Sequence, residues 1–231
     1  MELPAGKLPR KKTLLLFLRW LAIVVAALWL LAALTLVGLR WIDPPTTAVH
    51  LQRRVQAWIH NKPYHERYQF VPLGEISPNL QHAVIAAEDA RFYQHHGFDW
   101  EAIEDAAKED MEGGRTRGGS TLTQQLVKNL FFGTGRSFVR KGVEATLVPV
   151  AELVLGKQRI LELYLNVVEW GPGVYGAEAA CRAHETTTAR AIGRQQAAQL
   201  AAILPAPLKR RPERMVHYSA VILRRMSQMG W

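Results

Sequence analysis

The feature that most constrains this chain is a long apolar segment close to its N-terminus. Residues 21–39 read LAIVVAALWLLAALTLVGL without a charged side chain, and residues 13–18, which are apolar except for Thr13, precede them across Arg19. About 20 apolar residues in a helix span the hydrocarbon core of a bilayer. Since flanking segments rich in Lys and Arg stay in the cytoplasm, we predict a single-pass protein with a cytoplasmic N-terminus. The basic residues ahead of the segment include Lys7, Arg10, Lys11 and Lys12.

A cleaved signal peptide is the alternative interpretation of this segment. The apolar core of a signal peptide has about 7–15 residues and ends at a small-residue cleavage site. Here the apolar run is longer and ends in RWIDPP, which is typical of an interfacial Trp–Arg anchor with a stiff exit. We favour the uncleaved helix. The predicted parts are a basic cytoplasmic tail (1–12), a transmembrane helix (13–39), a membrane-proximal linker and helix (40–60) and one exported domain (61–231).

Composition narrows the class of the exported domain. A hydrophobic content of 48% excludes a disordered chain. The formal net charge of +9 favours an anionic partner, namely nucleic acid, anionic lipid or a phosphate-bearing substrate. We expect no nucleic acid, because the domain faces away from the cytoplasm and shows no nucleic-acid-binding module. The single cysteine, Cys181, excludes a disulfide framework and a Cys-based zinc site.

Apolar periodicity and capping residues predict a mainly helical domain. Ser77-Pro78 is a cap followed by proline at the first helical position, which is a common start of a helix. Residues 68–73 alternate enough for a short strand, and a basic loop, Arg115-Thr116-Arg117, lies between two pairs of glycines. Helices are predicted over 46–59 (with Leu51, Val55, Trp58 and Ile59 at helical spacing), after Ser77, Asp99 and Ser120, and over 140–155, 158–167, 189–204 and 213–229.

Two adjacent carboxylates follow the apolar run 83–87. Glu88 and Asp89 are costly to bury, so they indicate a solvated helix end, a metal site or an acid/base pair. A transition-metal site with His95 is disfavoured, because the chain has no His-Glu-x-x-His pattern and no dense cluster of ligands. The residues alone leave the other two interpretations open.

A second candidate stretch is GGSTLTQQLVKN, residues 118–129. A helix that begins at Ser120 would place Thr121, Gln125 and Lys128 on one polar stripe. The Gly-Gly-Ser entry to such a helix suits an anion, but an ordinary solvated face explains the spacing equally simply. The predicted buried stripe consists of Leu122, Leu126 and Leu130.

Two further pairs have helical i, i+4 spacing. Arg140 with Glu144, and Glu162 with Asn166, are each unremarkable on a helix surface. Together with Lys157 and Arg159 they gather cations and carboxylates on successive helices of one domain.

These stretches occur in a recognisable order. EDARFYQHHG (88–97), GGSTLTQQLVKN (118–129), RKGVE (140–144) and KQRILELYLN (157–166) resemble the ordered motifs of the peptidoglycan glycosyltransferases, glycosyltransferase family 51. AAILPAP (201–207) is similar to the late Leu-Pro segment of that family. The resemblance covers residues 51–212. It implies a lysozyme-like, mainly α domain with a membrane-proximal jaw lobe, preceded here by one N-terminal transmembrane helix.

The resemblance also implies a reaction. Members of the family polymerise lipid II into β-1,4 glycan strands with inversion, releasing undecaprenyl pyrophosphate, in bacterial cell-wall biosynthesis. By position Glu88 is the general base and Glu144 the second essential carboxylate, on the leaving-group side. Lys128, Arg140 and Lys141 are implied to stabilise the pyrophosphate. The remaining positions that match residues shaping or lining the family's cleft are Asp89, Phe92, His95, Thr121, Gln125, Asn129 and Glu162.

The implied ligands and location follow from the same resemblance. No organic cofactor is expected, and Glu144 acts either directly or through a divalent cation, Mg²⁺ or Mn²⁺. The partners would be lipid II, the nascent glycan strand, membrane lipid and proteins of the division or elongation machinery. The domain would lie on the periplasmic or outer face of the bacterial cytoplasmic (inner) membrane. The chain has no Ser-x-x-Lys motif, so we expect a monofunctional member without a transpeptidase domain.

Two segments depart from the family pattern. The family usually has a Tyr-Phe pair after the segment GPGVYGAEAA, where this chain has Ala183-His184-Glu185. The late segment usually reads Pro-Asn-Pro, and here it is Pro205-Ala206-Pro207.

Two other functions compete with polymerisation. A lysozyme-like hydrolase or lytic transglycosylase also uses a catalytic Glu, but it needs neither cations gathered for a pyrophosphate nor a membrane anchor. A non-catalytic membrane scaffold would fit the departures at His184 and Glu185, but it would not need the complete set of motif residues.

Overall fold

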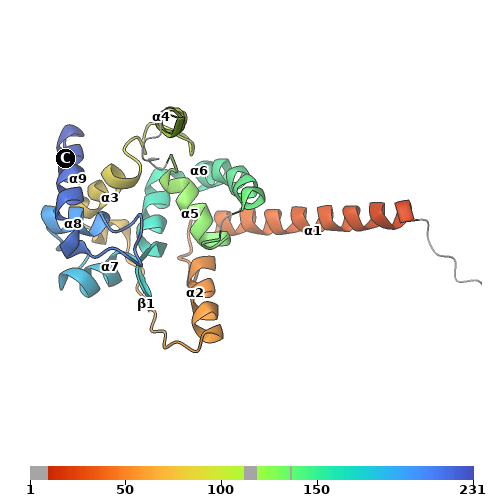
Figure 1. Cartoon of the computed structure of the whole chain (residues 1–231), viewed down its shortest axis with the longest axis horizontal. Coiled ribbons are helices and arrows are strands. Elements are labelled where there is room, and N and C mark those ends of the chain that lie inside the picture. Colours follow the sequence, from red (N-terminus) through yellow and green to blue (C-terminus); the bar gives the residue numbers. More distant parts are fainter. Residues whose placement is uncertain (1–9, 112–118, 136) are drawn as a thin grey trace, which may run out of the picture.

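A helical domain with one long projecting helix makes up this chain in the computed structural model (Figure 1). The structure describes residues 10–111, 119–135 and 137–231. The predicted basic loop at 115–117 lies outside these residues. The projecting helix, α1 (Arg10–Gly38), contains the one stretch of the described residues, Lys12–Gly38, that is long and apolar enough to cross a membrane.

The predicted mainly α fold is confirmed, and the elements follow one another closely. The domain contains α2 (Ala48–Ile59), α3 (Pro78–Glu88), α4 (Trp100–Met111), α5 (Leu122–Phe131), α6 (Phe138–Val167), α7 (Ala177–Ala180), α8 (Arg194–Ala201) and α9 (Val216–Gln228). Short 3₁₀ turns lie at Leu73–Glu75 and Pro212–Arg214, and a π turn lies at Cys181–Glu185. A small sheet of order β1-β3-β2 joins β1 (Arg67–Tyr68) in parallel to β3 (Val174–Tyr175), which pairs antiparallel with β2 (Glu169–Gly171).

The core forms where α3 and α5 pack against their neighbours. Ser77 accepts a hydrogen bond from Asn79 N and Pro78 opens α3, as predicted. The run 83–86 is buried against the rest of the core, and α3 packs on α8 and α9 while α5 packs on α6. The stripe Leu122, Leu126 and Leu130 is buried, as its spacing predicted.

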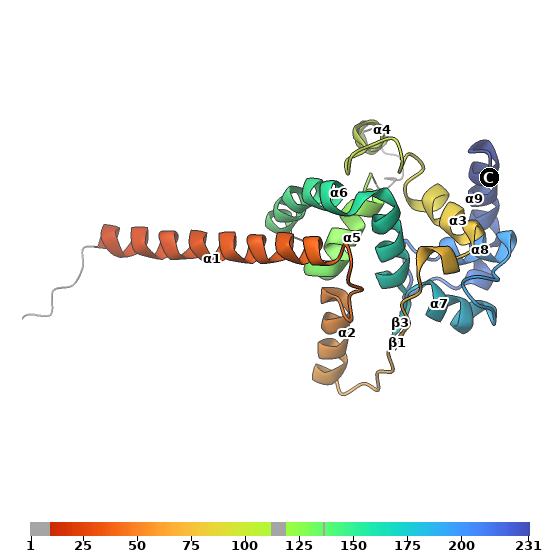
Figure 2. The ribbon, with the colours of Figure 1, turned by 180° about the vertical axis from the view of Figure 1, so that it is seen from behind.

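α6 is two helices joined at Gly156. This residue has φ = +70°, a conformation that glycine adopts without steric cost, and the chain bends there. The break explains why the sequence predicted two helices, over 140–155 and 158–167. The first half of α6 lies beside α1, and the second half runs into the domain (Figures 1 and 2).

The end of α1 belongs to the domain core. Leu36, and Leu39 just after the helix, are buried there, whereas the preceding apolar residues are mostly exposed. Trp29 Nε1 donates a hydrogen bond to Thr146 Oγ1 on the first half of α6, at 2.8 Å. The long helix is therefore packed onto the domain rather than tethered by a flexible linker.

Arg159 fixes the exit of α1. Its guanidinium donates to the backbone oxygens of Leu39 (2.8 Å) and Ile42 (3.1 Å) and to Asp43 Oδ1 (2.8 Å). On the other side it donates to Glu162 Oε2 at 2.5 Å. Carbonyl groups just beyond a helix end lack intrahelical partners, so one half-buried cation satisfies them and joins α1 to α6.

α2 forms within the predicted helix 46–59, with Thr47 as its cap. Its apolar positions lie outside the core, because the opposite side of α2 packs on the domain through Val49 and His50, which are buried. Trp58 is 79% exposed.

Three sequence predictions were wrong in detail. The strand predicted over 68–73 ends at Tyr68, because Val71 and Leu73 donate their backbone N–H groups to side chains of α6 rather than to a neighbouring strand. The helix predicted over 189–204 is shorter, since α8 begins only after Gly193. The helix predicted to start at Ser120 is capped instead by Thr121, with Gln124 completing a capping box.

We predict that replacing Arg159 by Met lowers the free energy of unfolding by about 2–4 kcal/mol, because Glu162 and the carbonyls at the end of α1 lose their cation. Thermal unfolding in detergent should then show a melting temperature about 5–10 °C lower. Arg190→Met is the matched control, because that arginine pairs with Glu75 on the exposed surface and should shift the melting temperature little. Equal effects of the two variants would contradict the role of Arg159.

Candidate active site

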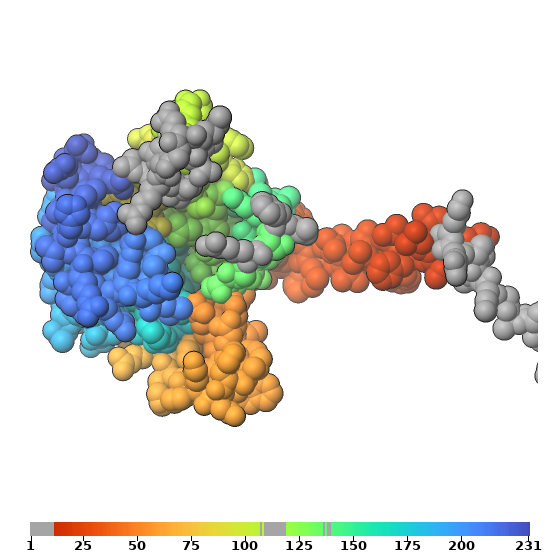
Figure 3. All heavy atoms as spheres, in the orientation of Figure 1, coloured from red at the N-terminus to blue at the C-terminus, as the bar shows by residue number. Residues whose placement is uncertain are grey.

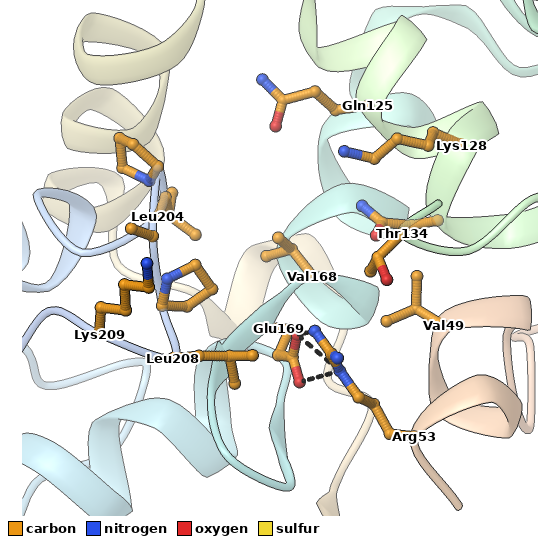
Figure 4. A pocket seen from close by; sticks show the side chains of 14 residues that line it. Val49, Arg53, Gln125, Lys128, Thr134, Val168, Glu169, Leu204, Leu208 and Lys209 are labelled. Atoms are coloured by element: carbon orange, nitrogen blue, oxygen red, sulfur yellow. Dashed lines mark hydrogen bonds and ion pairs between the residues drawn. The ribbon is translucent and has the colours of Figure 1, made fainter. Parts of the chain in front are cut away.

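A pocket of about 240 Å³ opens between α5, α2 and the loop that follows α8 (Figure 4). Gln125 and Lys128 project into it from α5, opposite Leu204 and Lys209 of the loop. Its other lining residues are Val49, Arg53, Asn129, Thr134, Val168, Glu169, Pro205, Ala206, Pro207 and Leu208. The sequence-predicted residues Gln125, Lys128 and Asn129 are thus gathered on one wall.

Glu88 lies at the last turn of α3 and is tied to this wall. Its Oε2 accepts a hydrogen bond from Gln125 Nε2 at 2.8 Å. Gln125 Oε1 in turn accepts from the buried Tyr164 hydroxyl at 3.0 Å. Because the tyrosine hydroxyl donates to one end of the amide, the NH₂ group of Gln125 is directed at Glu88.

Burial raises the pKa of Glu88 above its ordinary value. The hydrogen bond from Gln125 and the charges of Lys128 and Arg210 act in the opposite direction, and the neighbouring Asp89 raises the pKa further. A carboxylate with a raised pKa is a stronger base, while nearby cations favour the ionised form that a base requires.

Asp89, which follows Glu88 in the chain, has a structural role. Its Oδ2 accepts from the backbone N–H of Leu122 at 2.9 Å, at the N-terminus of α5. His95 lies within 2.9–3.1 Å of both carboxylate oxygens. Since the N–H of Gly97 donates to His95 Nδ1 at 3.1 Å, the proton of the neutral ring is on Nε2 and points at Asp89. Burial raises the pKa of Asp89, and these two donors oppose the shift.

A second pocket, of about 150 Å³, is lined by this pair of carboxylates. Its described lining residues are Glu88, Asp89, Ala90, Arg91, Asp99, Ala102, Gly119, Ser120 and Thr121. Glu88 therefore lies at one pocket and is hydrogen-bonded to a residue of the other. This position suits a group that acts between two bound molecules.

Asp89, His95 and Asp99 also bring their possible ligand atoms within 4.8 Å of one another. Protein donors already occupy these groups, because Arg91 makes two hydrogen bonds to Asp99, at 2.7 and 2.9 Å, and His95 donates to Asp89. The cluster is explained as a hydrogen-bond network that supports the turn after α3.

Arg140 and Glu144 lie near the start of α6. Arg140 Nε is 2.7 Å from Glu144 Oε1, and both side chains are largely buried. Neither of these two atoms has a hydrogen bond of good geometry with any residue that the structure describes. Arg140 also donates to the carbonyl of Gly133, next to the pocket residue Thr134, while Lys141 is exposed on the same helix.

Of the other predicted site residues, Phe92 and Glu162 lie behind the pockets, whereas Thr121 lines the second one. Phe92 is fully buried in the core, with the ammonium group of Lys157 4.6 Å from its ring centre, so it shapes the site only through packing. Thr121 caps α5 and donates to the carbonyl of Gly97. Glu162 accepts from Leu73 N and pairs with Arg159, which positions it as support for the α1 exit.

The residues at the far end of the pocket between α5 and α2, the larger of these two pockets, were not predicted from the sequence. Arg53 holds Glu169 with two nitrogens, the closest contact being 2.8 Å (Figure 4). Gln56 accepts a hydrogen bond from the same guanidinium. Lys209 lies across from them in the loop. Glu169 lies three positions after the motif KQRILELYLN (157–166), but nothing in the sequence distinguishes Arg53 from Arg54 as its partner.

Comparison with known proteins identifies the family of this chain. A family model described as Transglycosylase matches residues 54–227. The chain belongs to the transglycosylase family. It is 47% identical over 211 residues to a biosynthetic peptidoglycan transglycosylase of Pseudomonas putida, covering 89% of each chain. It is 48% identical over 212 residues to that of Pseudomonas entomophila (89% of each chain), and 46% over 207 residues to that of Ectopseudomonas mendocina (88% of this chain, 86% of the relative).

Membership of the transglycosylase family confirms the predicted activity, a peptidoglycan glycosyltransferase of cell-wall synthesis. The departures from the family pattern can now be placed. His184 lies in the π turn and its Nε2 is 3.1 Å from the carbonyl of Trp170, so it packs behind β2. Ala206 lines the larger pocket.

Because Glu88 and Asp89 have different partners, substitutions at these two residues should change the melting temperature in opposite directions. Because burial disfavours ionised Glu88, we predict that Glu88→Gln raises the melting temperature at neutral pH. The raised pKa makes the destabilisation by wild-type Glu88 greatest above the folded-state pKa and absent below the unfolded-state pKa. The gap between variant and wild type should therefore close as the pH is lowered through this range. A lower melting temperature for Glu88→Gln at neutral pH would contradict the assignment.

Asp89→Ala should instead lower the free energy of unfolding by about 1–3 kcal/mol, because the buried N–H groups of Leu122 and His95 lose their acceptor. That loss exceeds the gain from removing a buried charge. Differential scanning fluorimetry in detergent should show a melting temperature about 3–10 °C lower, and an unchanged value would contradict this role of Asp89.

Proposed function

We propose that this enzyme polymerises lipid II by an inverting displacement, with Glu88 as the general base. The observation that carries the proposal is the position of this buried carboxylate at one pocket and, through Gln125, at the wall of a second. In the proposed reaction the 4-hydroxyl of the acceptor attacks C1 of the donor sugar. Glu88 takes the hydroxyl proton while the bond from C1 to the pyrophosphate oxygen breaks.

The departing pyrophosphate would be stabilised by the cations along α5 and α6. Lys128 projects into the larger pocket, and Arg140 contacts the backbone next to it. Fixed cations favour charge that develops on the leaving oxygens. Lys141, exposed on the same helix as Arg140, is proposed to extend this group.

An apolar groove supports a lipid-linked substrate. It has a volume of about 720 Å³ between α1 and the first half of α6. The groove begins one residue beyond Lys141 on α6, so a prenyl chain in it would hold a pyrophosphate beside the proposed cations. It is lined by Ala22, Val25, Ala26, Trp29, Gly142, Val143 and Thr146.

The location of the enzyme is part of the proposal. We propose that α1 spans the bacterial inner membrane with its N-terminus in the cytoplasm, which places the domain on the periplasmic or outer face. The positive charges ahead of the apolar run and the absence of charge in residues 21–39 support this orientation. The nascent glycan strand would leave on the same side, and proteins of the division or elongation machinery remain proposed partners.

Glu88→Gln should reduce polymerisation of lipid II by at least about 10²-fold, because the amide cannot accept the hydroxyl proton. The assay uses full-length protein in detergent and measures lysozyme-sensitive glycan. Glu75→Gln is the control, since Glu75 pairs with Arg190 on the surface and should leave the rate unchanged. Wild-type glycan yields from Glu88→Gln would show that another group is the base. Solubilisation of finished cell wall without lipid II would instead favour the hydrolase.

We also propose that Glu144 holds a divalent cation together with pyrophosphate oxygens. Its Oε1 makes no described hydrogen bond despite its ion pair with Arg140, and Mg²⁺ commonly binds through one or two carboxylates plus substrate phosphates. Such an ion would neutralise charge on the leaving group. EDTA should then slow the wild type, and Mg²⁺ should restore it, whereas Glu144→Gln should be slow and insensitive to EDTA. A wild type unaffected by EDTA would contradict the cation.

A further inference from the structure

The outer face of α2 is apolar although it is exposed. Leu51, Val55, Trp58 and Ile59 are 56%, 43%, 79% and 63% exposed. Their spacing of i, i+4, i+7 and i+8 places them on one side of the helix. An exposed helix face normally carries polar residues, and an apolar stripe of this kind marks an interaction surface.

The position of α2 relative to α1 indicates what covers this face. α2 runs crosswise to α1, just beyond the end of α1 and on the side of the domain from which α1 projects (Figures 1 and 2). The space-filling view shows the segment around α2 at the lower edge of the domain, next to the base of α1 (Figure 3). A helix that lies crosswise to a membrane-spanning helix lies along the membrane surface.

The length of α1 places α2 at the level of the lipid headgroups. The membrane-spanning candidate Lys12–Gly38 has 27 residues, which corresponds to about 40 Å of helix. A bilayer measures about 40–45 Å including its headgroup regions. The outer end of α1, and with it α2, therefore lies near the headgroups rather than well out in solution.

Aromatic residues at this level agree with an interface. Trp58 on α2 and Trp41 at the α1 exit are 79% and 73% exposed, and Ile42 beside it is 66% exposed. Tryptophan is enriched where apolar tails meet polar headgroups. Amphipathic helices with such residues lie in the interface with the apolar face in the headgroup and acyl boundary.

We propose that α2 is an interfacial helix whose stripe of Leu51, Val55, Trp58 and Ile59 is inserted into the outer leaflet. The proposal rests on the membrane-spanning position of α1 in the proposed function. The domain is then held to the bilayer at two places, which restricts its tilt relative to the membrane surface. This orientation keeps the site at a fixed height above the headgroups of its lipid-linked substrate.

The test is spin labelling of full-length protein in nanodiscs of phosphatidylethanolamine and phosphatidylglycerol. Cys181 is buried, so single cysteines introduced as Leu51→Cys, Trp58→Cys, Leu28→Cys and Gln228→Cys can be labelled selectively. Leu28 is an exposed residue of α1, and Gln228 is exposed on α9, far from α1 (Figure 1). Collision rates with oxygen and with a water-soluble nickel complex report the depth of each label.

Labels at 51 and 58 should show an oxygen-to-nickel ratio several-fold above that at 228 and below that at 28. A ratio at 51 and 58 equal to that at 228 would overturn the proposal while leaving the anchor intact. Protection of 51 and 58 from both reagents would also overturn it, in favour of a second copy or another protein on this face. A water-like ratio at 28 would show that the membrane anchor itself is wrong.

Discussion

The Asp89 carboxylate holds the end of α3 against the start of α5, and the position of the site depends on this contact. Because it accepts from both the Leu122 backbone and His95, the chain cannot unwind after Glu88 without exposing two unpaired donors. Glu88 is thereby fixed next to Gln125, one turn into the same α5. The two adjacent carboxylates therefore differ in role: Asp89 holds the helices together, and Glu88 is the proposed base.

The same packing links the site to the membrane. α5 packs on α6, and α6 carries Arg159 in its second half and the groove beside α1 in its first. A shift of α1 would therefore displace the helix that presents Arg140 and Glu144. This rigid connection suits an enzyme whose proposed substrate remains in the bilayer, because it keeps Glu88, the proposed base, at a constant height above the membrane.

The sequence predicted the helices better than the contacts that they make with distant parts of the chain. Caps such as Ser77 and Asp99, and the periodic burial of Leu122 and Leu126, are local signals and can be read from neighbouring residues. The roles of Arg53 and Glu169 depend on a contact across 116 positions, which no local pattern reveals. The apolar stripe of α2 likewise predicts a helix, but only the three-dimensional structure shows that the stripe faces outward.

The strand predicted over 68–73 was wrong for a related reason. Side chains of α6 accept the hydrogen bonds from this backbone that a neighbouring strand would have accepted. The site residues came from the order of motifs, which identifies a family without showing geometry. The structure adds that Phe92 and Glu162 act behind the pockets, while Gln125, Lys128 and Asn129 line one of them.

The most direct test of the account is the pH dependence of kcat/KM for lipid II polymerisation, which reports the pKa of the essential base in the free enzyme. Burial of Glu88 predicts that the rate falls on the acid side around a pKa above the ordinary value of 4.5. Because the charge of Lys128 lowers the pKa of Glu88, Lys128→Met should move this limb to higher pH. A limb at the ordinary value, or one that Lys128→Met leaves in place, would contradict Glu88 as the base.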